Sequence, residues 1–119
     1  MSYKVFNLDD KTDIKGWLCG QFFPDNDIRK TDNLEVKFNY LEPGFTMAEH
    51  FHPLGDELFI VLKGKIKMKF DGAEQTLFAG DYVFQKPNTK DALIEVFEPS
   101  ECLTVRSPSI PNNKVEIKQ

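Results

Sequence analysis

The sequence predicts an all-β barrel or sandwich, and three observations support this prediction. Short β-prone runs with period-two alternation recur along the chain, with turn-forming residues between them. No stretch shows a convincing helical period. Eleven phenylalanines in 119 residues supply the bulky side chains that fill the inside of a small barrel.

Length and charge limit the kind of protein this can be. A chain of 119 residues can build one core but not two, so we expect a single domain over 1–119. Its core barrel is expected at about 34–107, with N-terminal strands and a C-terminal tail packed outside it or on a partner subunit. The net charge of −4, without a Lys/Arg cluster, gives no electrostatic basis for nucleic-acid binding. No apolar run reaches the roughly eighteen residues of a membrane span, and no signal-like segment opens the chain. We therefore expect a cytoplasmic protein that binds neither nucleic acid nor a membrane.

The first third of the chain predicts strands separated by polar loops. A short strand followed by a polar loop is expected within 1–15, and a strand interrupted by Gly20 within 16–23. Residues 24–33 are dense in turn formers and charges and predict a loop. The segment 34–41 alternates strictly, which is typical of a half-buried strand. One of its faces carries Val36, Phe38 and Tyr40, and the other carries Glu35, Lys37 and Asn39.

The alternation resumes over 45–52 and continues to the end of the chain. Lys63 and Gly64 predict a tight hairpin turn before a regular strand at 65–70, and Asp71 and Gly72 predict a second hairpin. Further short strands are expected at 74–78, 81–85, 93–97 and 102–106. The turns between them are expected at Gly80, Pro87-Asn88 and Pro99-Ser100. In the tail, Val115 and Ile117 alternate and predict an edge strand or a segment that crosses to a partner.

The chemistry concentrates in the stretch from Gly44 to Gly64. His50 and His52 are the only histidines in the chain, and they lie two residues apart. In a strand, such residues point to the same face. The loop before Glu57 can reverse the chain and bring this carboxylate beside both imidazoles. Two neutral imidazoles and a carboxylate on one concave face suit a divalent Fe, Mn, Ni or Zn ion.

This stretch resembles the first motif of the cupin superfamily. The motif reads Gly, five residues, His-x-His, four residues, Glu, six residues, Gly, and all five of its fixed positions are matched in register. The matching residues are Gly44, His50, His52, Glu57 and Gly64. The resemblance implies a single-domain cupin, a double-stranded β-helix or jelly-roll-like barrel with a metal or ligand in its mouth. It does not name a reaction, because one fold hosts many chemistries.

The second cupin motif is only partly present. Counted from Gly80, the chain has Asp91 where the motif has its third histidine, and Glu95 where it has asparagine. Because no third histidine exists, the family's set of three histidines and one glutamate cannot be assembled. Three interpretations stay open. In the first, Asp91 replaces the histidine as a metal ligand, which favours Fe or Mn. In the second, His50, His52 and Glu57 bind the metal alone as a facial triad. In the third, the metal has been lost and the barrel is a pocket for an organic ligand. Asp91 is alternatively a loop carboxylate that only caps its turn.

Residues that could line the barrel cavity come from several strands. They are Phe38, Tyr40, Phe59, Met68, Phe84 and Arg106. Arg106 is one of two arginines and could clamp a carboxylate or phosphate on a ligand. Alternatively, these side chains only fill the core or lie in solvent at the rim.

These observations leave three functions open. The first is a small metal-binding cupin, such as a metal-dependent oxygenase or isomerase that acts on a small organic acid or carbonyl compound. The second is a non-catalytic binding or sensing cupin with a lost or vestigial metal site. The third is a sugar-nucleotide epimerase or isomerase of the same fold that works without a metal, which would need His50 or His52 and Tyr40 to face the pocket together. Whether the chain is an enzyme is therefore not decided by its sequence.

Two further features concern packing. The faces away from the two histidines and Glu57 carry apolar side chains, including Leu58, Ile60 and Leu62. Exposed together they would form a larger patch than a monomer usually tolerates, so we expect a homodimer or an N-terminal segment to cover them. Cys19 and Cys102 are most simply buried thiols, although the sequence also allows a disulfide.

Overall fold

The computed structural model describes residues 2–8 and 16–117, and these residues form strands and loops without a helix. Consequently, no helix long and apolar enough to cross a membrane is found in this part of the chain. The strands are β1 (Trp17–Cys19), β2 (Glu35–Leu41), β3 (Met47–Phe51), β4 (Asp56–Phe70), β5 (Ala73–Phe78), β6 (Tyr82–Gln85), β7 (Asp91–Ser107) and β8 (Val115–Glu116). The predicted all-β fold is confirmed.

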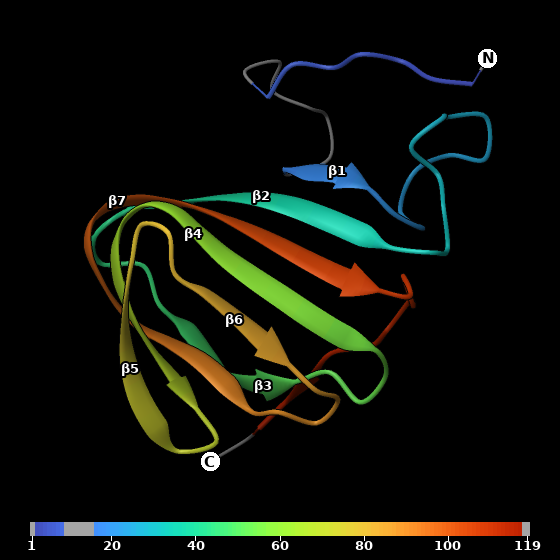
Figure 1. Cartoon of the computed structure of the whole chain (residues 1–119). Coiled ribbons are helices and arrows are strands. Elements are labelled where there is room, and N and C mark those ends of the chain that lie inside the picture. The colour runs from blue at the N-terminus through green and yellow to red at the C-terminus, as the bar shows by residue number, and fades with distance from the viewer. Residues whose placement is uncertain (1, 9–15, 118–119) are drawn as a thin grey trace.

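The barrel has two layers because β4 and β7 are long enough to serve both (Figure 1). The first half of β4 pairs with β6 and with the second half of β7, which also pairs with β2. The second half of β4 pairs with β5 and with the first half of β7, which also pairs with β3. The strand β1 extends the first layer beyond β2, and β8 extends the second beyond β3. All of these pairings are antiparallel.

Two predicted turns are strand bends instead. The chain passes through Gly64 within β4 and through Ser100 within β7, where the sequence predicts a hairpin and a turn. Gly64 has φ of 96°, and a Cβ at this position would overlap the Ser100 hydroxyl. The Ser100 Oγ accepts a bond from Lys65 N at 3.1 Å and donates to Glu98 O at 2.8 Å, so it repairs the interrupted ladder. Gly64 therefore does not form a turn. It allows two strands to approach each other where a larger side chain would not fit.

Other turn predictions are confirmed. Asp71 and Gly72 both have positive φ and join β4 to β5 in a tight hairpin. The tail forms an edge strand, since β8 pairs with β3. No strand lies among residues 2–8, and the remainder of the N-terminal strand and loop prediction falls mostly on 9–15, outside the described residues.

The core lies between the two layers, toward the end where β4 and β7 bend. The inward residues of β4 are buried as predicted by their alternation, and they pack against β2, β5 and β7. The buried cluster consists of Leu41, Phe59, Val61, Ile66, Met68, Leu77, Leu93, Val96 and Cys102. Partly buried Met47, Phe70 and Val83 pack against it. Above this apolar floor the barrel opens into a cavity.

Candidate functional site

The cavity has a volume of about 300 Å³, and one of its walls is a row of polar residues. The backbone register places Gln85, Glu57, Arg106 and Glu35 side by side across β6, β4, β7 and β2. Glu57, Arg106 and Glu35 line the cavity, and Gln85 bonds to Glu57 from the side. Cross-strand neighbours of opposite charge stabilise such a row.

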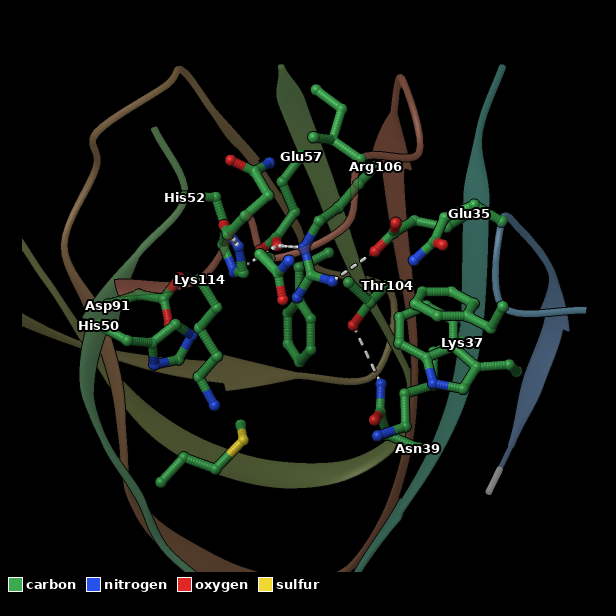
Figure 2. A pocket seen from close by; sticks show the side chains of 18 of the residues that line it. Glu35, Lys37, Asn39, His50, His52, Glu57, Asp91, Thr104, Arg106 and Lys114 are labelled. Carbon is green, nitrogen blue, oxygen red and sulfur yellow. Dashed lines mark hydrogen bonds and ion pairs between the residues drawn. The ribbon is translucent and has the colours of Figure 1, made fainter. Parts of the chain in front are cut away.

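Glu57 is held through both of its carboxylate oxygens. Arg106 Nε donates to Glu57 Oε1 at 2.6 Å, and Gln85 Nε2 donates to Glu57 Oε2 at 2.7 Å. Arg106 Nη1 donates to Glu35 Oε2 at 2.8 Å (Figure 2). Burial alone would lower the pKa of Arg106, but Glu57 and Glu35 raise it above its ordinary value. Arg106 is therefore a permanent cation between two buried carboxylates.

The two histidines point into the same cavity, and a backbone carbonyl orients each ring. The Nδ1 of His50 lies 2.8 Å from Ala48 O, and the Nδ1 of His52 lies 2.6 Å from Asn113 O. A carbonyl can only accept, so each Nδ1 carries a proton and donates it to the carbonyl, which leaves each Nε2 facing the cavity. The ring centroids are 5.3 Å apart.

A bulge in β3 makes this arrangement possible. The register shifts between Met47 and His50, so that both residues line the cavity although an odd number of positions separates them. In a strand without a bulge, period-two alternation would place Ala48 on the same face as His50. Because of the bulge, Ala48 is exposed instead, and its carbonyl accepts the hydrogen bond from His50 Nδ1–H.

Neither Nε2 atom is satisfied by an ordinary neutral hydrogen bond. The Nε2 of His52 is buried without a partner among the described residues, and Glu57 Oε1 is 3.8 Å away. Burial, followed by the charge of Arg106, lowers the pKa of His52 to about 4, so its ring is neutral near pH 7. An unpartnered buried lone pair is costly, which makes this atom a natural place for a donor or a metal ion.

Asp91 faces the second imidazole. It is the residue directly opposite His50 in the β3–β7 register, and its Oδ1 lies 3.1 Å from His50 Nε2. Burial raises the pKa of Asp91 to about 6. Because a lone pair and a carboxylate oxygen repel each other, this contact requires either a proton or a cation between the two atoms. Asp91 thus lies at the site rather than capping a loop.

The donor set fits a divalent metal by its chemistry. Two imidazole Nε2 atoms, each oriented by a carbonyl behind the ring, and two carboxylates form a typical ligand and supporting shell. In this conformation, no three His, Cys, Asp or Glu side chains among the described residues converge on one metal-ion position. Glu57 instead faces Arg106 and Gln85. The types of donor atom therefore suit a metal ion, but the side chains do not surround one position in this conformation.

The structure places only part of the predicted pocket lining on the cavity wall. Phe59, Met68 and Arg106 line it. Phe38 and Tyr40 do not, because the inward face of β2 carries Glu35, Lys37, Asn39 and Leu41. Tyr40 is 60% exposed and Phe84 is 56% exposed, both on the outer face. Those three lining predictions are wrong, and a histidine–Tyr40 pair in the pocket does not exist.

Sequence reasoning missed several wall residues. Glu35 and Gln85 are buried partners of Arg106 and Glu57, and the opposite assignment of faces in their strands would have found them. Asn39 Nδ2 donates to Thr104 Oγ1 at 3.0 Å on the same wall. Asn113 and Lys114 come from the tail, where no local pattern signals a cavity wall.

Comparisons with known proteins agree with this architecture. The family described as the cupin domain matches residues 38–105. A comparison with curated proteins finds no match. A solved structure of an uncharacterized conserved protein with a double-stranded beta-helix domain, from Klebsiella pneumoniae subsp. pneumoniae, is similar with a TM-score of 0.70 and 21% identity. That similarity covers 98% of this chain and 99% of the other.

Two enzymes share the fold over a shorter span. The DMSP lyase DddQ from Ruegeria pomeroyi has a TM-score of 0.65 and 23% identity, over 73% of this chain and 44% of its own. Oxalate decarboxylase from Bacillus subtilis has a TM-score of 0.64 and 18% identity, over 73% of this chain and 24% of its own. The present chain thus spans less than half of either enzyme. The cupin-domain family matches more than half of the length of the present chain, and the chain therefore belongs to this family.

Proposed function

We propose that this chain is a metal-binding cupin whose cavity takes a small organic acid or carbonyl compound. The observation that carries the proposal is the orientation of His50 and His52. Both rings donate from Nδ1 to a carbonyl, so both Nε2 atoms face one cavity. That of His52 is buried without a partner among the described residues, and that of His50 lies 3.1 Å from Asp91 Oδ1. Such an arrangement is unfavourable without a bound group and favourable with a metal ion.

The residues that would hold the ion are His50, His52, Asp91 and Glu57. Oxygen ligands favour Fe or Mn over softer ions, although Ni and Zn also accept this donor set. When bound, the metal would supply a Lewis acid or a seat for O2 activation, which is the chemistry of an oxygenase or isomerase. Oxalate decarboxylase, one of the structural neighbours, is named for a small carboxylate and is consistent with this ligand class.

The chain's own side chains would orient the ligand and exclude water. Phe59, Met68, Leu41 and Met47 form an apolar side of the cavity. Arg106 provides a charged donor on the opposite polar wall. A cavity of about 300 Å³ is at the small end of ligand sites, which favours a small molecule over a polymer. A cytoplasmic location stays a prediction.

A metal-free binding or sensing module is the second candidate. Arg106 and Gln85 satisfy both oxygens of Glu57, so this carboxylate needs no further cation. In that case the His52 Nε2 would accept a hydrogen bond from the ligand instead. The two candidates differ in whether a divalent ion binds before any organic molecule does.

Metal binding by the purified, chelator-treated full chain tests the proposal. We expect about one equivalent of Mn, Fe, Ni or Zn per chain by calorimetry and elemental analysis, and none in the His50→Ala, His52→Ala double variant. Asp91→Asn should weaken binding about tenfold or more if Asp91 is a ligand. Asp81→Asn, at an exposed turn, is the matched control and should bind like the wild type. A wild type that binds none of the four ions would favour the metal-free candidate.

A further inference from the structure

Arg106 has an unusual charge environment for a residue on a ligand cavity. Its guanidinium is bonded to two carboxylates at once, Glu57 at 2.6 Å and Glu35 at 2.8 Å. Both carboxylates are buried, and Glu35 is fixed further by Ser109 Oγ, which donates to it at 2.9 Å. The three groups therefore carry a net charge of about −1 when both carboxylates are ionised. An anionic ligand approaching Arg106 would meet this excess of negative charge.

The same guanidinium still has unused donors. Arginine has five N–H groups, and the structure commits only Nε and one N–H of Nη1 to the two carboxylates. The Nη2 group has no hydrogen-bond partner among residues 2–8 and 16–117, and Arg106 lines the cavity. Figure 2 shows Arg106 between Glu57 and Glu35, on the side of the cavity across from His50 and Asp91. Arg106 thus has free N–H groups that could bind an anion, but the two carboxylates bonded to it outweigh its positive charge.

Glu57 connects this arginine to the proposed metal ligands. Its Oε1 is the atom that Arg106 Nε bonds, and the same atom lies 3.8 Å from His52 Nε2. One carboxylate oxygen cannot serve a guanidinium and a metal ion equally well. If Glu57 ligates a divalent cation, its charge is neutralised and the cation repels the guanidinium. Arg106 then keeps Glu35 as its single counterion and gains a free N–H edge.

We propose that Arg106 is the anion-binding residue of this cavity and that its charge becomes available to a carboxylate only after Glu57 has turned to a divalent cation. This inference rests on the proposed function, because it requires the metal site. It names the ligand as a small carboxylate, since the planar fork of arginine matches carboxylate oxygens. Binding of cation and carboxylate is then positively coupled, and the coupling is reciprocal.

The first experiment compares benzoate with benzamide, an uncharged molecule of nearly the same shape. Each is titrated into chelator-treated full chain and into chain loaded with Mn or Zn. We expect benzoate to bind the loaded chain at least about tenfold more tightly than the metal-free chain, whereas benzamide gains little. Equal benzoate affinity with and without the ion, or an equal gain for benzamide, would overturn the inference.

Variants separate Arg106 from direct coordination of benzoate by the ion. Arg106→Gln should bind the metal ion at least about tenfold more tightly than the wild type, because a competing cation is removed, and should lose most of the benzoate gain. Lys67→Gln removes one positive charge at a site outside the cavity and should change neither quantity. An R106Q chain that retains wild-type metal affinity and the full benzoate gain contradicts the inference.

Arg106→Lys covers the case in which R106Q does not fold. It keeps the positive charge but loses the fork, so we expect near-wild-type metal affinity and a reduced benzoate gain. The failures of the two proposals are distinguishable. If the wild type binds no ion, both proposals are overturned. If it binds the ion but R106K and R106Q keep the benzoate gain, only the role of Arg106 is overturned.

Discussion

Cys102 shows at the residue scale how the fold sets chemistry that the sequence leaves open. Both cysteines are free thiols. Cys102 is fully buried, with β2 and β4 as its neighbours on either side of β7. Burial, with a smaller contribution from the charge of Glu101, raises the pKa of its thiol to about 12. A disulfide between Cys19 and Cys102 is therefore not part of this fold.

We expect Cys102 to resist alkylation in the native protein. Only the thiolate reacts quickly, and a pKa near 12 means that the thiolate forms only as the pH approaches that value. In the variant Cys19→Ser, iodoacetamide at pH 8 should label the native chain much more slowly than the chain in denaturant. Mass spectrometry measures the label. Native labelling at the rate of the denatured chain would contradict this prediction.

The candidate site was only partly predictable from its residues. His50, His52, Glu57 and Asp91 follow from motif spacing, and the structure brings them to one cavity. Period-two alternation identifies two faces of a strand but does not say which face points inward when the interior is a polar cavity. For this reason the alternation of 34–41 leads to the wrong side for Phe38 and Tyr40 and overlooks Glu35. Long-range partners such as Asn113 leave no local signal at all.

At the element scale, the bends in β4 and β7 determine the shape of the barrel. Gly64 and the Pro99-Ser100 pair read as turns because Gly and Pro are the usual turn residues. The structure uses them to bend two continuous strands, so that each strand belongs to both layers. Local composition cannot separate a turn from a bend, because the difference depends on what the strand pairs with afterwards.

Substitution of Gly64 should be far more costly than substitution of another glycine with similar backbone geometry. Gly64→Ala introduces a Cβ that overlaps Ser100 Oγ and lies 2.7 Å from Ser100 Cα, at φ of 96°. We expect a loss of at least about 2 kcal/mol in the free energy of unfolding. Gly72→Ala is the control, since its φ is 88° but nothing lies within 4 Å.

For Gly72→Ala, backbone strain alone should cost about 1 kcal/mol. Urea unfolding followed by fluorescence or circular dichroism gives both values. Equal losses for the two variants would show that the contact with Ser100 contributes nothing.

At the scale of the whole molecule, the first layer presents an apolar outer surface. Two rows of apolar side chains cross the neighbouring strands β6, β4, β7 and β2 in register. One row is Phe84, Leu58, Val105 and Val36, and the other is Tyr82, Ile60, Leu103 and Phe38. The sequence predicts that a second subunit or the N-terminal segment covers this outer surface, and that stays a prediction.

We expect a homodimer formed through these two rows, because closed two-fold pairing buries such a surface most simply. Phe84→Glu places a charge in one row and should give a monomer in size-exclusion chromatography with light scattering. Phe78→Glu changes an equally exposed phenylalanine on β5, in the other layer, and should stay dimeric. A monomeric wild type, or a dimeric F84E, would be inconsistent with this interface.

The tail also affects when the binding site is completed. Asn113 brackets the loop after β3, since its side chain accepts from Leu54 N at 3.0 Å and donates to Leu54 O at 2.7 Å, while its carbonyl accepts the His52 proton. A ribosome releases residues 44–64 long before residue 113. The carbonyl that holds the proton on His52 Nδ1 belongs to Asn113. This hydrogen bond can therefore form only after residue 113 has emerged and the tail has docked against the loop. The contact that fixes the ring of His52 is therefore among the last that the growing chain can make, although His52 itself belongs to the first half of the sequence.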